Sequence, residues 1–317
     1  MRINIYIIVN HITHIITAGI LFCLLCSCED EFEPEDDQFE DRIVIEGYIE
    51  GGVIPTAPYV IVTRTFPFFS ELTPDILDTL FVNDVELTVF SNGVPFPLTQ
   101  ICFDDIPDQV QPLIVDQLPN IGLALEATEA CIFTNPLLLG IEGQAYDLQV
   151  DYQGRRYRAS TTIPQRVPLD SLSYSIFQDT LLQVTGHLSD PPGEQNFYRY
   201  QSQRNQDFIY AGVNSVFPDD IVNGESFGFP LLRGQLRTDE FDFETFGFFN
   251  RGDSILIKWN SIDQDHYNFW NTLEFSTGSA GPFSSLVYVD TNFEGPDDLI
   301  RGIWGGYANT FQYIITE

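Results

Sequence analysis

The chain has 317 residues, of which 44% are hydrophobic and 14% aromatic, and it carries a formal net charge of −32. This composition excludes a wholly disordered protein, because it supplies enough apolar surface for a folded core. The acidic balance argues against nucleic acid and anionic lipid head groups as partners, since both are bound through basic patches. We interpret the charge as a source of solubility, with attraction to cationic partners or divalent ions as the alternative.

An apolar run over residues 15–25 is followed by Cys28, after which the sequence becomes strongly acidic. The run has the length of a signal-peptide core and is shorter than the roughly 20 residues of a spanning helix. Leu25 stands three residues before Cys28, and a small residue directly precedes it, as a lipoprotein peptidase requires. We predict a signal peptide over residues 1–27 and a lipid anchor on Cys28. Cys26 fits less well, and a plain secretory signal is the alternative.

Residues 28–41 are rich in Glu and Asp, which predicts a tether between the anchor and the folded body. Beyond the signal region only Cys102 and Cys131 remain. An even pair in an exported chain predicts a disulfide, whose loop of about 30 residues would contribute about 3 kcal/mol. The alternative is that strand geometry keeps the two sulfurs apart. A zinc site is poorly supported, because only His187 and His266 could complete it.

The periodicity of side chains becomes that of β-strands after residue 41, with β-branched and aromatic residues alternating with polar ones. Two hairpins stand out, because Asn92-Gly93 and Gln153-Gly154 supply the positive-φ residues of tight turns. Strands are expected at residues 42–50, 59–66, 85–90, 146–152 and 155–162. Together they predict an Ig-like antiparallel β-sandwich over residues 42–165.

A stretch rich in Pro, Asp and Leu interrupts this sandwich at residues 101–136, with both body cysteines near its ends. We interpret it as an insertion that is stapled at its base, and residues 122–130 could form a short helix within it. Such an insertion is either a binding loop or a segment whose sequence drifts freely, and both interpretations stay open.

Two prolines within residues 163–168 mark the predicted domain boundary, and residues 166–317 are expected to form a second β-rich domain. Further strands are predicted at residues 172–177, 181–188, 196–202, 254–259, 286–289, 302–307 and 311–315. The strand at 254–259 contains Lys258, the only lysine of the protein. The predicted fold is therefore mainly β, with two domains.

One short helix is predicted over residues 263–275, where Tyr267 and Trp270 recur at helical spacing and Ser261 or Asp263 is available as an N-cap. Its aromatic face is expected to pack on a sheet rather than to bind a sugar. The Phe-rich stretch at 217–249 either packs at the edge of a core or faces a partner. The pair Gly305-Gly306 is too short for a phosphate loop, and close backbone packing explains it better.

The sequence lacks the HExxH, P-loop and dinucleotide-binding motifs, and no Ser or Cys stands in a recognisable nucleophile signature beside His187 or His266. Acidic pairs such as Asp219-Asp220 and Asp297-Asp298, and also Asp104-Asp105, could serve a glycosidase. In so acidic a chain we expect them to solvate loops instead. Calcium binding is conceivable, but no motif supports it, so we predict no cofactor and no enzymatic activity.

The lipidation pattern with its acidic tether, the hairpin at residues 146–162, the strand at 252–257, the helix with Tyr267, Pro282-Phe283 and the Gly-rich run 303–307 together resemble domain-of-unknown-function family 4249. The resemblance covers essentially the whole chain after Cys28. It implies a surface-exposed outer-membrane lipoprotein, whose acidic run after Cys28 directs it to the cell exterior.

The same resemblance implies a non-catalytic accessory subunit of a SusC-like TonB-dependent transporter that serves nutrient uptake. A stand-alone surface lipoprotein that binds a glycan or a peptide through the aromatic residues of 217–249 is the alternative. A hydrolase that uses the acidic pairs is the least favoured hypothesis.

Overall fold

The computed structural model describes residues 41–65, 79–102, 105, 131–220, 222–235, 242, 244–278 and 289–317. The predicted signal peptide, the predicted lipid site Cys28 and the predicted tether up to residue 40 lie outside the described residues. So do most of the insertion, with its predicted helix at 122–130, and most of the strand predicted at 286–289. In the described part of the chain no helix is long and apolar enough to cross a membrane.

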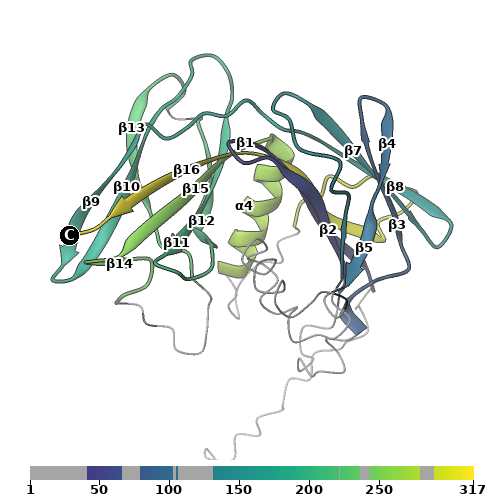
Figure 1. Ribbon diagram of the computed structural model, residues 1–317, viewed down its shortest axis with the longest axis horizontal. Helices are drawn as coiled ribbons and strands as arrows, with labels where there is room; N and C mark the ends of the chain where they lie inside the picture. Colours follow the sequence, from purple (N-terminus) through teal and green to yellow (C-terminus); the bar gives the residue numbers. More distant parts are fainter. Residues whose placement is uncertain are drawn as a thin grey trace, which may run out of the picture. The chain divides into compact units, whose positions relative to one another are not determined.

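The largest element is a central sheet of eight strands, in which the first described strand pairs with the last (Figure 1). In spatial order its strands are β12 (Tyr210–Pro218), β11 (Phe197–Arg204), β15 (Ser254–Ile262), β16 (Ile300–Ile315), β1 (Ile43–Gly52), β2 (Thr56–Arg64), β6 (Cys131–Thr134) and β5 (Thr99–Cys102). The β1–β16 pair is parallel, with Ile43 opposite Ile300, and the other neighbours are antiparallel.

Two four-stranded sheets complete the β structure of the described residues. One has the order β4 (Val94–Pro97), β3 (Glu86–Ser91), β7 (Ala145–Tyr152), β8 (Arg155–Thr162). In the other, β10 (Leu181–Ser189) pairs with β13 (Ser226–Leu231), β14 (Phe249–Asn250) and β9 (Ser171–Gln178). Both predicted hairpin turns are confirmed, since Asn92 and Gln153 have φ values of 51° and 49° and each precedes a positive-φ glycine.

Strand β16 contributes to each of the three cores of the described residues, because its side chains alternate between the two faces of the central sheet. Trp304 joins a core with the β3–β7–β8 sheet, and Ile314, on the same face, packs against a core with the β10 sheet. Tyr307 points to the opposite face and packs under α4 (Gln264–Gly278). Among the described residues, α4 is the only complete helix. The two smaller sheets thus cover one face of β16 and the helix covers part of the other (Figure 1).

The predicted helix is confirmed, and so is the packing of its aromatic face. Asp263 is the N-cap, because its Oδ1 accepts a hydrogen bond from the His266 backbone N–H at 2.9 Å. Trp270 is buried against the central sheet, and Tyr267 packs at the edge of the same core. Close packing also explains Gly305, since a Cβ atom there would lie 2.5 Å from the His266 ring.

Two expectations about chain organisation meet a different arrangement. The separate strands predicted at 302–307 and 311–315 are one continuous strand, because Ala308, Asn309 and Thr310 keep pairing with β15. The boundary predicted between residues 165 and 166 falls where the chain passes from the first core to the second. The central sheet takes strands from both sides of this boundary, and residues 40–317 form one compact unit. The division into an Ig-like domain and a second domain stays a prediction.

Candidate functional site: a groove on the central sheet

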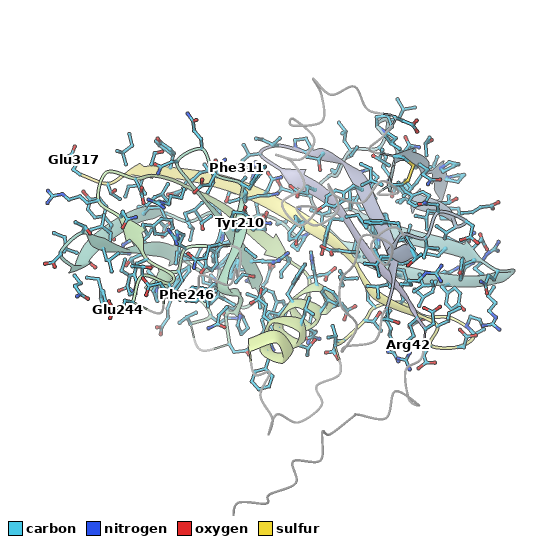
Figure 2. The ribbon with its side chains drawn as sticks, turned by 90° about the horizontal axis from the view of Figure 1, so that it is seen from below. Arg42, Tyr210, Glu244, Phe246, Phe311 and Glu317 are labelled. Atoms are coloured by element: carbon cyan, nitrogen blue, oxygen red, sulfur yellow. A yellow bond between two sulfur atoms is a disulfide. The ribbon has the colours of Figure 1, made fainter. Side chains whose placement is uncertain are left out.

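A groove of about 500 Å³ lies on the face of the central sheet that also carries α4. Its described lining residues come from five strands of the sheet, the β1–β2 turn and the residue before β12. They are Glu50, Val53, Ile54, Thr56, Gln201, Gln203, Ile209, Leu256, Lys258, Asn309 and Phe311. Figure 2 labels Phe311 on β16 and Tyr210, the first residue of β12, which directly follows Ile209. Among the described residues the walls are mostly aliphatic and the floor is polar.

An ion pair occupies the floor of the groove. The Lys258 Nζ lies 2.7 Å from Glu50 Oε1, and both side chains are largely buried. The second carboxylate oxygen of Glu50 accepts a hydrogen bond from Asn309 Nδ2 at 2.9 Å. Each charge has a partner, which buried charges require. The groove therefore offers no net charge, although the whole chain carries −32.

Asn309 also fixes the turn between β1 and β2 at the rim of the groove. Its backbone C=O accepts from the Val53 N–H at 3.0 Å. Its side-chain amide accepts from the Ile54 N–H at 3.0 Å and donates to the Ile54 C=O at 2.7 Å. The Val53 and Ile54 side chains are nevertheless exposed to solvent. Two apolar side chains are thus presented to solvent on a turn whose backbone is held in place.

Gln201 is the groove residue whose polar capacity is left unused. It stands opposite Lys258 in the β11–β15 pairing, and its residue surface is only 6% exposed. Its Oε1 is buried and accepts no hydrogen bond from any described residue. An unpaired buried amide oxygen costs about 1–3 kcal/mol.

A further set of polar side chains lies beneath α4, and it includes the buried Arg199. Its guanidinium carbon lies 3.4 Å from the centre of the Trp270 ring. Its Nε donates to Ser215 Oγ at 3.2 Å, and its Nη1 donates to the Tyr307 hydroxyl. Burial raises the pKa of Tyr307 to about 12 in spite of Arg199, so the hydroxyl is neutral and accepts this bond. The carboxylate of Glu274, on α4, accepts a hydrogen bond from the Ser215 backbone N–H at 2.8 Å.

His266 fills the centre of this covered region. Its ring stacks on Tyr48 at 5.4 Å between ring centres and is fully buried. No described group forms a well-aligned hydrogen bond with either ring nitrogen. Burial and the charge of Arg199 lower the pKa of His266 well below its usual value, with partial opposition from the Gly306 backbone. The imidazole is therefore neutral, and it has neither the partners nor the solvent access of a catalytic base.

A family model described as "Domain of unknown function (DUF4249)" matches residues 29–312. The chain belongs to this family. A search of curated proteins found no match. The resemblance noted from the sequence is thereby confirmed, and the DUF4249 description assigns no activity to the groove.

In this DUF4249 chain the sulfurs of Cys102 and Cys131 are 2.04 Å apart in a disulfide, which is drawn as a yellow bond in Figure 2. The two cysteines stand opposite each other in the β5–β6 pairing, at the point where the insertion leaves and rejoins the central sheet. The predicted lipid site, Cys28, lies outside the described residues.

Two of the three acidic pairs that a hydrolase could use contribute to structural contacts. Asp219 is buried and accepts a hydrogen bond from the Asn196 backbone at 2.9 Å. Asp297 accepts from Arg155 at 2.6 Å and from the Tyr157 hydroxyl at 2.7 Å. Asp104 lies outside the described residues. Within the described residues no group of three or more His, Cys, Asp or Glu side chains is placed to hold a metal ion.

The phenylalanines in the described part of residues 217–249 mostly turn inward. Phe217 and Phe229 lie 6.4 Å and 5.4 Å from the Trp259 ring, and Phe249 is fully buried. Residues 236–241 and 243 lie outside the described part. The described rings therefore pack a core, and the aromatic residue that lines the groove is Phe311, which sequence reasoning did not single out.

One polar pair that resembles catalytic chemistry was not anticipated. The Ser173 Oγ lies 2.8 Å from His187 Nε2 across the β9–β10 pairing. Ser173 is exposed on the sheet, and no described carboxylate is hydrogen-bonded to the other ring nitrogen of His187. A nucleophile without an orienting third group or donors for an oxyanion does not make a triad, so we interpret this pair as a surface hydrogen bond.

Proposed function

We propose that the chain is a surface-exposed outer-membrane lipoprotein that acts as a non-catalytic accessory subunit of a SusC-like TonB-dependent transporter. The lipidation pattern at Cys28, the acidic run that follows it and membership of the DUF4249 family support the proposal. The groove on the central sheet is the binding surface that this role requires. Its ligand belongs to the transporter or to the transported material.

The proposal rests mainly on a contrast between the residues of the groove and the acidic and basic side chains elsewhere in the described part of the chain. The acidic pairs and the buried Arg199 are occupied by structural contacts. The groove combines the exposed apolar side chains of Val53 and Ile54 with a few polar side chains on a rigid sheet. Such a concave, largely preformed site with a few polar groups is typical of binding rather than of acid–base catalysis.

The test is purification of the tagged full chain from outer membranes after chemical crosslinking in cells. We expect a TonB-dependent transporter to co-purify in a fixed ratio, and Cys28→Ser to abolish the complex by removing the anchor. Recovery of the wild-type chain from outer membranes without any such transporter, with and without crosslinking, would refute the proposal.

A stand-alone lipoprotein that binds a glycan or a peptide is the second candidate, and the groove itself favours it. Phe311 stands there beside the amide side chains of Gln201 and Asn309, which combines apolar contact with hydrogen-bonding groups. On this hypothesis glycan and peptide arrays give hits that Phe311→Ala removes, while no transporter co-purifies. Arrays without a hit would count against this candidate.

A further inference from the structure

Strand β9 forms one edge of the smaller sheet that is built around β10. It is eight residues long, and among the described residues it pairs with β10 alone (Figure 1). The pairing is regular from Ser171 to Ile176 and shifts its register at Phe177. No described group outside β10 forms a hydrogen bond with the backbone of residues 171–178. Because the backbone groups of a strand point alternately to its two sides, the outer side of β9 presents open donors and acceptors.

The edge strands elsewhere in the described sheets are protected against a further strand. Strand β4 contains Pro95 and Pro97, and β13 contains Pro230, so each lacks backbone N–H groups. The outer edge of β8 is already occupied, because Arg158 and Glu294 exchange two backbone hydrogen bonds of 2.8 Å.

The two edges of the central sheet are protected as well. In β12 the positive φ of Asn214 accompanies a break in the pairing with β11, and the neighbouring Ser215 N–H is bound by Glu274. Strand β5 has only four residues. By contrast, β9 contains no proline and no charged residue. An edge without these protections is a template for pairing with another chain, and β9 is the long edge strand of the described part that lacks them.

The side chains of β9 define the pattern of a strand that would fit beside it. Leu172 and Tyr174 are partly buried and pack against the core beneath the β10 sheet. Ile176 continues this row but is 62% exposed. The intervening serines, at 171, 173 and 175, are exposed on the other face. A further strand with apolar residues at every second position would extend the core and cover Ile176.

The surroundings of β9 define the charge of that strand. Asp170 directly precedes β9 and Asp179 directly follows it, and both are exposed. The Glu317 backbone N–H donates to the Tyr174 hydroxyl at 3.1 Å, which places a third acidic residue beside the strand. None of these acids forms an ion pair with a described residue. Basic residues at the ends of an incoming strand would therefore be attracted, whereas a second copy of this chain would bring the same acids.

We propose that β9 binds an extended segment of a partner protein as an additional strand. The backbone of this segment pairs with residues 171–176, its alternate apolar side chains extend the core beneath the β10 sheet, and its basic ends lie near Asp170 and Asp179. The inference goes beyond the proposed function, because it assigns a second interaction surface on a different sheet from the groove.

The experiment selects short random peptides displayed on phage against the full chain in mild detergent. We expect the enriched peptides to alternate apolar and polar residues, to lack proline in the middle and to carry Lys or Arg near their ends. The best synthetic peptide is then methylated at one backbone nitrogen at a time. Since methylation removes an N–H donor, an added strand should lose roughly tenfold or more in affinity at every second position and little at the positions between.

A matched pair of substitutions locates the binding site on the chain. Ile176 on β9 and Val94 on the proline-containing edge β4 are 62% and 52% exposed. A lysine on an edge strand opposes pairing and would repel basic peptide ends. We expect Ile176→Lys to weaken binding by roughly tenfold or more and Val94→Lys to leave it unchanged. Equal thermal unfolding of both variants shows that folding is intact, and the methylation series tests strand pairing on the unmodified chain.

Several results would overturn the inference. These are the absence of any enriched peptide, enrichment of acidic peptides, methylation losses that do not alternate, or equal binding to the two variants. Self-association in sedimentation velocity that Ile176→Lys abolishes would make a second copy of the chain the occupant. The peptide experiment gives its answer whether or not a transporter co-purifies with the chain, so failure of the inference and failure of the proposed function are distinguished.

Discussion

The side chain of Asn309 on β16 pairs with the backbone of Ile54 in both directions, accepting from its N–H at 3.0 Å and donating to its C=O at 2.7 Å. The amide thus replaces the backbone partner that a further strand would provide. We expect Asn309→Ala to lower the free energy of unfolding by about 2 kcal/mol, because it leaves buried polar groups unpaired. Urea unfolding of the full chain measures this, with the exposed Asn271→Ala as control. Equal loss in both variants would contradict the role of Asn309.

The Lys258–Glu50 ion pair allows a test of how much stability is lost when one buried charge is left without its partner. Lys258→Met should lower the free energy of unfolding by about 3 kcal/mol, because Glu50 then stays buried with Asn309 as its remaining partner. Adding Glu50→Gln should restore part of the stability, since the double variant buries no charge. A double-mutant cycle in urea measures the coupling, and strictly additive effects would show that the pair is energetically unimportant.

Because His266 is buried and neutral, we expect the folded chain to become less stable in mild acid. Its pKa in the folded chain lies well below the value of about 6.5 in the unfolded chain, so between these values the unfolded state binds one more proton. Stability from this group is therefore present above pH 6.5 or so and is lost as the pH falls below it.

The measurement is the urea midpoint at neutral and mildly acidic pH for the wild-type chain and for His266→Phe, which keeps a flat ring over Gly305. The variant should show the smaller change between the two conditions. An identical change in both proteins would mean that other groups cause the acid sensitivity.

The close contact between Gly305 on β16 and the His266 ring on α4 leaves no room for a larger residue at position 305. Gly305→Ala would place a Cβ atom 2.5 Å from the His266 ring, and the helix would have to move. We expect a loss of about 2 kcal/mol, typical of overpacking. Combining it with His266→Ala removes the clash, so the double variant should lose less than the sum of the two single losses. Additive losses in thermal unfolding would show that the contact is not limiting.

On the proposed function, the acidic run after Cys28 directs the chain to the outside of the cell. Replacing Glu29, Asp30 and Glu31 by Ala should keep the lipid but remove the proposed address, so the chain becomes protected from protease added to intact cells. The wild-type chain should be cleaved under the same conditions. If the triple variant is cleaved equally well, the run is only a spacer.

Local signals predicted the local structure well. The Asn92-Gly93 and Gln153-Gly154 turns fixed two hairpins because few other residues adopt positive φ, and the Asp263 cap with aromatic residues at helical spacing located α4. The pairing of β1 with β16 could not be predicted, since no sequence pattern links Ile43 to Ile300.

The groove was missed for the same reason. Most of its residues occupy ordinary strand positions on β1, β2, β11, β15 and β16, and they converge only through long-range pairing. The one available signal was that Lys258 is the only lysine of an acidic chain, which marks it as a residue with a specific partner. The sequence did not identify Glu50 as that partner, because the distance between them depends on the sheet order.

The position of β16 between β15 and β1 also determines when this protein can fold. Strand β1 cannot pair with its parallel neighbour until residues 300–309 of β16 have been synthesised. The same holds for the pairing of β15 with β16. The complete central sheet and the groove therefore form only after almost the whole chain has been synthesised. Pairing over such separations is slow, which delays completion of the sheet. A chain that ends before Ile300 would lack the strand that joins the two halves of the sheet.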